Sequence, residues 1–492
     1  MPSPVYLLPT HPSFFSDDPL GVVAAGEGIE SSDGSHSAAA VLQSLLRAAM
    51  SNLATGNADP ALVWPVLVEE IAWSLHRDGN VDTSFLRRVL GYETFFTNRR
   101  SGAAGTENDH DDSPLKSAVL CILHAACDLP TVFPLHSVPF LSHETTLVTF
   151  TPRQVDALLA HMALCALHSS PAGGDWGRPG FVSWYSGSNA SKHTEAVTRY
   201  IEILASLFAR GGYSRILGVP ADQPWLTFAL STCSDNDPSP SDLHHSICPL
   251  FSISTVPFES HPSSSTTQLP PFMLIPSHRN PGPGPSATTE ELILASSPAL
   301  CLISLVCPSI PSHSAVVTSS VPVEAAWSGY GRTARVTQFP LLGISRRFVA
   351  ADALELDAEF VGLDVGIPDL HHDFLRRELS KLRAAFNGAQ QLHLSASHDA
   401  PPVIETPPWG CGAFGGNILV KAALLAVAAG MEDVQLRLFM VEGREGVAQV
   451  SALEGRRVGE LWGSLVVERR ERCRNMQELA DFMNQFWGML QN

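Results

Sequence analysis

Hydrophobic residues follow two different spacings along the chain, and the change between them falls near residue 210. Before that point they recur at the intervals of amphipathic helices. The segments with this spacing are 38–50, 61–77, 84–96, 114–127, 151–167 and 191–209. Thr151 followed by Pro152 is a typical helix start. The pattern predicts a mostly helical domain over residues 1–210, with a solvated acidic loop at 102–113.

Beyond residue 210, short β-branched and aromatic runs alternate with helical segments. Strands are predicted at 225–232, 250–258, 299–307, 313–320, 346–354 and 434–441, and helices at 369–387, 418–431, 457–469 and 475–490. Stretches rich in Ser, Pro and Thr around 234–245 and 260–290 predict low-complexity inserts, because they contain little that could be buried. The alternation predicts an α/β/α sandwich with a mixed sheet over residues 211–492.

Composition narrows the class of protein. The chain has 492 residues, of which 45% are hydrophobic and 16% charged, enough apolar material for two or more domains. Its 31 basic and 49 acidic residues give a net charge of −18, so its overall field does not attract DNA and no direct DNA binding is expected.

Cysteine usage and the N-terminus predict a location. Nine cysteines form no CxxC pair and no Cys/His cluster with zinc spacing, which predicts reduced thiols in an intracellular compartment and no metal site. The N-terminus has no basic segment followed by a long apolar one, so it does not resemble a signal peptide. The apolar run after Gly416 contains Lys421 and is too short to cross a bilayer, so no membrane association is expected.

The most distinctive stretch is ETPPWGCGAFGGNILVK, residues 405–421, with four glycines between Gly410 and Gly416 followed by an apolar run. Glycine lets the backbone approach a ligand closely, and a helix that begins beside such a loop presents free N–H groups to an anion. Asn417 is placed to cap that helix. The stretch therefore predicts a phosphate or pyrophosphate site; the alternative is an ordinary glycine-rich turn before a buried helix. It matches neither the Walker loop nor the GxGxxG fingerprint.

WGCGAFGG followed by a helix resembles the pyrophosphate-binding segment of poly(ADP-ribose) glycohydrolases. Further segments resemble that family in the same order along the chain. They are SHETTLVTFTPRQVDALLAHMALCAL (142–167), NPGPGPSATTEELILASSPAL (280–300), VEAAWSGYG (323–331), RRFVAADALEL (346–356) and FLRRELSKLRAAFNG (374–388). The resemblance implies a macrodomain-like fold over 211–492, preceded by a helical accessory domain over 1–210.

The resemblance also implies an activity, the hydrolysis of ribose–ribose O-glycosidic bonds. Glu291 matches the family's acid/base and Glu290 the glutamate that holds the hydroxyls of the cleaved ribose. Two adjacent carboxylates can divide these tasks if their environments differ, although adjacent glutamates also occur as a solvated helix start. The residues expected to bind substrate are Thr289, Tyr330, Gly410, Cys411, Gly412, Ala413, Phe414, Gly415, Gly416 and Asn417. Tyr330 matches the family's active-site tyrosine; the alternative is a tyrosine in a surface turn.

The chain departs from the family pattern at several places, and the family's upstream aspartate and asparagine are not evident, with only Asn280 nearby. Thr289 stands where the family has glutamine, and PGPGP at 281–285 replaces a triple glycine. Val441 occupies the place of an aromatic residue that stacks on the ligand, with Phe439 close by. Because proline removes backbone donors and fixes φ, these changes favour an alternative function, a macrodomain that binds ADP-ribose and hydrolyses it poorly or not at all.

The family further implies partners and a location. Poly(ADP-ribose), ADP-ribose and ADP-ribosylated proteins are the expected partners, and no cofactor is expected. We expect a monomer in the nucleus and cytoplasm that takes part in the DNA damage response.

Overall fold

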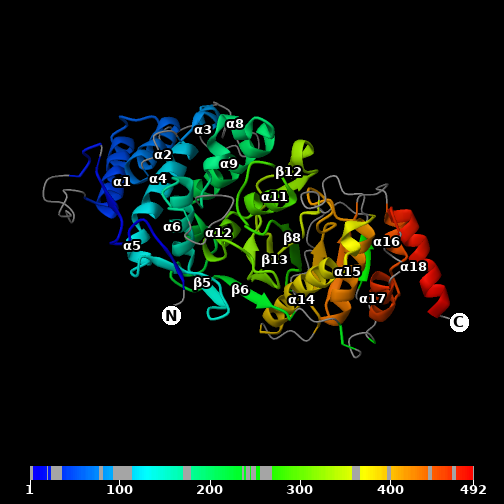
Figure 1. Ribbon diagram of the computed structural model, residues 1–492. Helices are drawn as coiled ribbons and strands as arrows, with labels where there is room; N and C mark the ends of the chain where they lie inside the picture. The colour runs from blue at the N-terminus through cyan, green and yellow to red at the C-terminus, as the bar shows by residue number, and fades with distance from the viewer. Residues whose placement is uncertain are drawn as a thin grey trace. The chain divides into compact units, whose positions relative to one another are not determined.

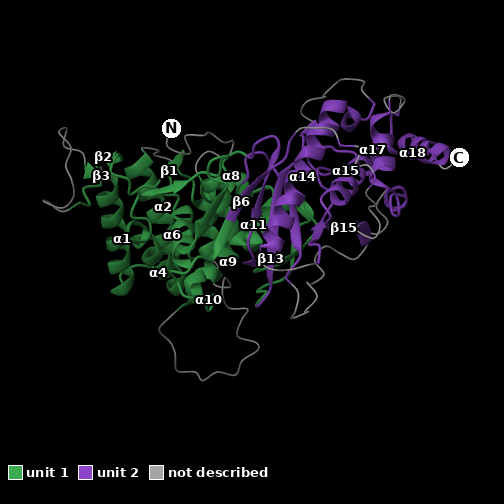
Figure 2. Cartoon of the chain, turned by 90° about the horizontal axis from the view of Figure 1, so that it is seen from below, with its two compact units in different colours: residues 1–227, 282–309, 323–342 green, residues 228–281, 310–322, 343–492 purple. Residues whose placement is uncertain are grey.

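The computed structural model describes residues 4–18, 20–23, 36–76, 81–91, 113–169, 179–234, 238–239, 244, 251–254, 269–356, 366–395, 400–440, 446–467 and 473–490 (Figure 1). The predicted acidic loop lies outside them except for Ser113, as do Val441 and most of the predicted insert at 234–245. Two compact units divide the chain (Figure 2). Unit 1 contains residues 1–227, 282–309 and 323–342, and unit 2 contains residues 228–281, 310–322 and 343–492.

Unit 1 is mainly helical, as the spacing of its apolar residues predicts. Its principal helices are α1 (Ala38–Ala54), α2 (Pro60–His76), α3 (Ser84–Leu90), α4 (Pro114–Cys127), α5 (Leu129–Val132), α6 (Pro152–Ala163), α7 (Val182–Tyr185), α8 (Gly187–Ala190), α9 (Thr194–Ala209) and α10 (Tyr213–Ile216). Thr151 caps α6 in a reciprocal capping box with Gln154, and Pro152 occupies the first turn, where its missing N–H costs nothing.

Two later segments of the chain complete unit 1. They carry α11 (Thr289–Ser296), the 3₁₀ helix η3 (Pro298–Leu302), α12 (Ile303–Val306), the hairpin of β11 (Ala326–Ser328) and β12 (Arg335–Gln338), and the 3₁₀ helix η4 (Gly331–Thr333). Short strand pairs β1 (Val5–Leu7) with β4 (Ser137–Pro139) and β2 (Phe15–Ser16) with β3 (His36–Ser37) lie elsewhere in the unit. The compact units thus follow a different division from the single boundary predicted at residue 210.

A mixed nine-stranded sheet forms the centre of the α/β part. In unit 2 its strands are ordered β6 (Leu226–Thr232), β9 (Ser314–Thr318), β13 (Ser345–Asp352), β8 (Phe272–Ser277), β14 (Val403–Thr406), β15 (Gln435–Phe439) and β7 (Phe251–Ser254), and β10 (Val321–Pro322) pairs with β13. The remaining strand, β5 (Leu147–Phe150), belongs to unit 1 and lies beside β6, whose first residues belong to the same unit. From β13 to β7 the pairings are parallel, so their carboxyl ends lie at one edge of the sheet.

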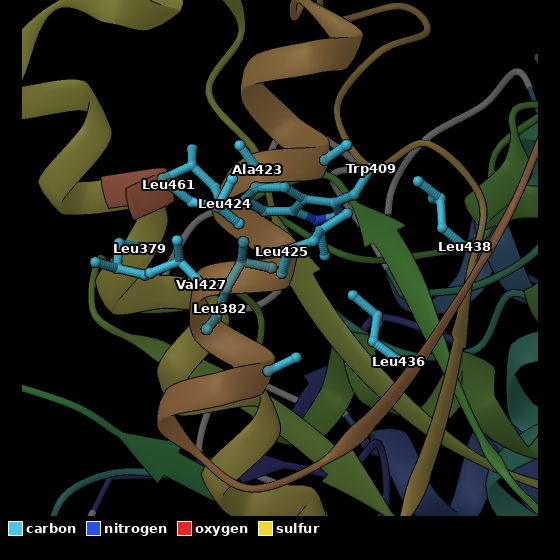
Figure 3. Close-up of a cluster of buried hydrophobic side chains, with 14 of the residues drawn as sticks. Leu379, Leu382, Trp409, Ala423, Leu424, Leu425, Val427, Leu436, Leu438 and Leu461 are labelled. Atoms are coloured by element: carbon cyan, nitrogen blue, oxygen red, sulfur yellow. The ribbon is translucent and has the colours of Figure 1, made fainter. Parts of the chain in front are cut away.

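Helices α14 (His372–Leu394) and α15 (Ile418–Met431) cover one face of this sheet, with α16 (Val447–Ser451), α17 (Val458–Val466), α18 (Met476–Leu490) and the 3₁₀ helix η5 (Pro368–Leu370) in the same unit. Figure 3 shows side chains of α14, α15 and β15 meeting in the core around Trp409. Helix α15 is buried almost all round, which its nearly continuous apolar sequence requires. Mixed sheet, flanking helices and the helical N-terminal region together give an α/β fold of the macrodomain type.

Two predictions about elements were wrong, and strand β14 was missed. Residues 299–307 form η3 and α12 instead of a strand, because a short continuous apolar run has no period that separates strand from helix, and Pro298 starts a helical turn there. The predicted insert at 260–290 contains the buried central strand β8 and the start of α11. Strand β14 was not predicted, because VIET is short and lies between proline-containing segments.

Among the described residues, no single helix is both long and apolar enough to cross a membrane. Helix α11 and the following helical segment reach that length and composition only as a pair bent by 113°.

Candidate functional site

The two glutamates lie in the first turn of α11, and both are buried. Glu290 is 5% exposed and Glu291 2% exposed. Thr288 caps the helix: its hydroxyl accepts from the Glu291 N–H at 3.3 Å, and its own N–H donates to Glu291 Oε2 at 2.8 Å. Thr288 and Glu291 therefore form the reciprocal capping box that a Thr-x-x-Glu sequence favours. This burial excludes the solvated helix start that the sequence left open.

The surroundings of Glu291 change the pKa of its carboxyl. Burial raises the pKa of Glu291, while hydrogen bonds from the N–H groups of Thr288 and Ser286 and the nearby His193 act to lower it. The balance is a raised pKa, because burial disfavours the charged form more than the donors favour it. Such a carboxyl can hold a proton closer to neutral pH than an exposed one.

The proline-containing loop before α11 is fixed from two sides within unit 1. Trp184 Nε1 donates to the Gly284 carbonyl at 3.0 Å, and the Gly331 N–H donates to the Ala287 carbonyl at 2.6 Å. Ala287 itself has a left-handed φ of 54°. The second bond places the Tyr330 turn beside the start of α11, with Tyr330 61% exposed. Unit 1 thus brings together Thr289, Glu290, Glu291 and Tyr330.

The glycine-rich loop precedes α15 in unit 2. Gly410 and Gly415 have φ values of 71° and 70°, which side-chain-bearing residues rarely adopt. The loop closes through the Gly416 N–H, which donates to the Gly410 carbonyl at 2.9 Å. Among the described residues, the N–H groups of Gly412, Ala413 and Phe414 donate to no acceptor, and Gly412 and Ala413 are exposed. A row of free donors at the start of a helix suits an anion.

Asn417 caps α15, as predicted. Its Oδ1 accepts from the N–H groups of Leu419 at 3.0 Å and Val420 at 3.3 Å, and its own N–H donates to Asp369 Oδ2 at 2.6 Å. The side chain of Asn417 is thus committed to the helix, so the donors that remain for a ligand belong to the loop. Cys411 is partly buried, and its thiol donates to the Trp409 carbonyl.

A buried charge cluster supports the loop, and the sequence did not predict it. Lys421, 1% exposed, makes an ion pair with Asp369 at 3.1 Å and a second one with Glu378. Burial acts to lower the pKa of Lys421, but the two carboxylates outweigh it and raise the pKa. A Cβ added at Gly416 would lie 2.6 Å from Lys421 Cε, so the lysine stem packs against the loop. The one available signal was a lysine within an otherwise apolar helix.

A second unpredicted group lies where the parallel strands end. His278 follows β8 and forms a 3.0 Å contact with Glu355, beyond β13. The ring of Phe414 lies 6.5 Å from that of His278, and the Phe414 carbonyl accepts from the Leu356 N–H at 3.0 Å. Carboxyl ends of parallel strands are where α/β folds bind ligands. Among the described residues, no group of three or more His, Cys, Asp or Glu side chains is placed to hold a metal ion.

Comparison with known proteins agrees with this fold. Residues 284–446 match the family model described as poly(ADP-ribose) glycohydrolase, macro domain fold. That stretch includes α11, Tyr330 and the whole glycine-rich loop. Residues 284–446, about a third of the chain, therefore match the macro domain fold of the poly(ADP-ribose) glycohydrolase family.

Two solved structures show some likeness. Poly(ADP-ribose) glycohydrolase from Deinococcus radiodurans in complex with ADP-ribose is 16% identical, with a TM-score of 0.27, over 37% of this chain and 73% of that chain. The alphavirus P23pro-zbd structure is 10% identical, with a TM-score of 0.23, over 66% of this chain and 41% of that chain. At these scores the family assignment rests on the family model.

Proposed function

We propose that this protein hydrolyses the ribose–ribose O-glycosidic bonds of poly(ADP-ribose) and releases ADP-ribose. The observation that carries this proposal is the burial of Glu290 and Glu291 in the first turn of α11. Cleavage needs a proton donor for the leaving oxygen, and a carboxyl in apolar surroundings keeps its proton to higher pH. The raised pKa of Glu291 supports that role.

The residues of unit 1 and the loop of unit 2 have separate tasks in this proposal. Glu291 protonates the leaving oxygen, and Glu290 binds the hydroxyls of the ribose whose bond breaks. The negative charge of the Glu290 carboxylate stabilises the oxocarbenium-like centre that forms on the cleaved ribose. The free N–H groups of residues 412–414 and the positive end of the α15 dipole bind the diphosphate. Thr289 and the exposed ring of Tyr330 contact the sugar.

The test compares two isosteric substitutions. Glu291→Gln keeps a side chain that is compatible with the capping box but cannot give up a proton. We expect it to bind ADP-ribose normally and to release ADP-ribose from the polymer about 10²–10⁴-fold more slowly. Glu290→Gln should lose both affinity and turnover, because a group that binds the hydroxyls also acts in the ground state.

Calorimetry with ADP-ribose and release of ADP-ribose from purified polymer provide the two measurements. Glu195→Gln, an exposed glutamate on α9, is the control and should change neither. Wild-type turnover in Glu291→Gln would contradict the assignment of the acid.

The second candidate function is a binding module for ADP-ribose with little or no hydrolysis. The proline-containing loop favours it: Pro281, Pro283 and Pro285 have no N–H, and the Gly284 carbonyl is already bonded to Trp184. In that case the unmodified protein would bind ADP-ribose and release none from the polymer.

Partners and location are part of the same proposal. ADP-ribosylated proteins would be the macromolecular substrates, and the nucleus and cytoplasm the sites of action in the DNA damage response. Fractionation of cells after DNA damage, with the protein detected in each fraction, tests this.

A further inference from the structure

Three aromatic side chains form a continuous column in unit 1. Trp184 of α7, Tyr200 of α9 and Trp327 of β11 follow one another, with ring centroids 5.1 Å apart for the first pair and 5.5 Å for the second. Phe181 also stacks on Trp184 at 4.2 Å. Tyr200 is therefore packed against two tryptophan rings.

The column is also bonded to both ends of the segment that carries the glutamates. Trp184 Nε1 donates to the Gly284 carbonyl at 3.0 Å, ahead of α11. Trp327 Nε1 donates to Ser296 Oγ at 2.7 Å, at the last residue of α11. Helices α9 and α11 are also in contact with each other. The position of α11 is thus tied to the rings that pack against Tyr200.

The Tyr200 hydroxyl differs from the two tryptophan N–H groups of this column, which both donate hydrogen bonds. Tyr200 is completely buried, and its hydroxyl has no hydrogen-bond partner among the described residues. A buried hydroxyl without a hydrogen-bond partner destabilises the folded protein. We therefore expect this hydroxyl to act during the reaction and not to stabilise the fold. Burial, and after it the negative charge of Glu291, raise the pKa of Tyr200 well above its ordinary value. The hydroxyl therefore keeps its proton and remains available as a donor.

We propose that Tyr200 is a positioning residue for Glu291, held by the two tryptophans so that its hydroxyl donates a hydrogen bond to the Glu291 carboxylate once that group has lost its proton. The inference rests on the proposed function. During cleavage the glycosidic bond breaks as the proton of Glu291 passes to the leaving ribose oxygen, which leaves a buried carboxylate and an oxocarbenium-like anomeric carbon. A water molecule then adds to that carbon and returns a proton to the carboxylate. A donor that meets the carboxylate as it forms lowers the energy of the transition state more than that of the ground state.

The decisive variant is Tyr200→Phe, which removes one oxygen and keeps the ring that packs against the two tryptophans. We expect kcat for release of ADP-ribose to fall about tenfold, with the affinity for ADP-ribose unchanged. The urea midpoint should stay the same or rise, because the hydroxyl has no partner in the fold. An unchanged kcat, or a midpoint that falls as turnover falls, would overturn the inference.

Tyr6→Phe is the matched control. Tyr6 is also a buried tyrosine of unit 1, and its hydroxyl donates to the His168 carbonyl at 2.7 Å. Its loss should lower the urea midpoint and leave kcat unchanged. Tyr200→Phe is thus expected to lower kcat without lowering the urea midpoint, and Tyr6→Phe to lower the urea midpoint without lowering kcat.

A direct titration separates this inference from the proposed function. Glutamate carboxyls labelled with carbon-13 report the pKa of Glu291 without any turnover, and the signal is assigned by its loss in Glu291→Gln. The groups that interact electrostatically with Glu291 are the N–H groups of Thr288 and Ser286, the side chain of Thr288, His193 at the start of α9, and Tyr200. Removal of a donor to the carboxylate should raise the pKa of Glu291 in Tyr200→Phe. If the wild-type protein has no turnover but this shift is seen, the proposed hydrolysis fails and the placement of Tyr200 stands; if the shift is absent, the inference fails.

Discussion

Buried ionisable side chains in this chain are held in two different ways. Arg346 and Glu405 are both buried and form an ion pair at 2.7 Å, to which Arg437 adds a second contact at 2.8 Å. His161 of α6 is instead completely buried with one ring nitrogen near the Ala157 carbonyl, and its Nε2 has no partner among the described residues. A charge that is paired is tolerated inside a protein, whereas an unpaired group stays neutral.

The neutral state of His161 predicts a pH dependence of stability. Burial lowers the pKa of His161 from 6.5 to about 4. Between these values the unfolded chain binds a proton that the folded protein does not, so the stability present above pH 6.5 is lost as the pH falls towards 4. We expect His161→Leu to reduce this slope by up to about 1.4 kcal/mol per pH unit, measured as urea unfolding free energies across the range.

The slope of stability against pH must be compared between His161→Leu and the wild-type protein, because Asp156 changes that slope in the opposite direction to His161. Burial raises the pKa of Asp156 to about 6, so the folded protein retains a proton there that the unfolded chain releases. The exposed His143→Leu serves as the control and should leave the slope unchanged. An identical slope in His161→Leu would mean that His161 is not kept neutral by the fold.

At the scale of elements, the glycine-rich loop and α15 form one structural unit that presents backbone N–H groups to a ligand. Asn417 caps the helix, Lys421 supports the loop from within α15, and the free N–H groups lie at 412–414. Its glycines differ in what they tolerate. A Cβ at Gly416 would lie 2.7 Å from the Gly410 carbonyl oxygen, whereas one at Gly412 would meet nothing within 4 Å.

Gly412→Val therefore tests the loop as an anion site without disturbing the fold. The new side chain has room in the ligand-free protein, but it projects where a diphosphate would have to approach the backbone. We expect ADP-ribose affinity to fall by at least about tenfold in calorimetry, with the thermal midpoint retained. Gly488→Val on α18, where an added Cβ also meets nothing within 4 Å, is the control and should bind ADP-ribose normally. Equal affinity in Gly412→Val would place the diphosphate elsewhere.

At the scale of the whole molecule, net charge opposes the proposed substrate. The chain carries −18, and poly(ADP-ribose) is itself a polyanion. Binding must come from local N–H groups, since the long-range field repels the polymer. A protein that binds a polyanion through many lysines and arginines loses affinity steeply as salt rises.

Salt dependence therefore distinguishes the two modes of binding. Between about 0.05 and about 0.5 M salt, we expect the affinity of this protein for poly(ADP-ribose) to stay level or to rise, because screening weakens the repulsion. Titration of labelled polymer at several salt concentrations measures this. A fall of about a thousandfold would indicate a basic surface that binds the polymer backbone.

The accuracy of the secondary structure predicted from the sequence differs from one element to another. The spacing of apolar residues predicted α15 from 418 to 431, and the structure gives Ile418–Met431. The same method failed at 299–307 and at β8, because a continuous apolar run fits either element and a central strand is defined by its neighbours. The assignment of Glu290, Glu291 and the 410–417 loop as the site remains a prediction, although the structure places Glu290, Glu291 and Tyr330 in one unit.

By itself the sequence determined what depends on neighbouring residues. The capping box of Thr288 and Glu291, the cap by Asn417 and the need for glycine at 410 and 415 each depend on residues within a few positions of one another. Only the tertiary structure decided which polar groups are buried. The same Glu-Glu pair would be solvated on an exposed helix, and the pKa of Glu291 is raised because the packing of α11, against α9 among others, buries its carboxyl. Burial depends on contacts between residues far apart in the chain, such as Tyr200 and Trp327, and no local pattern encodes them.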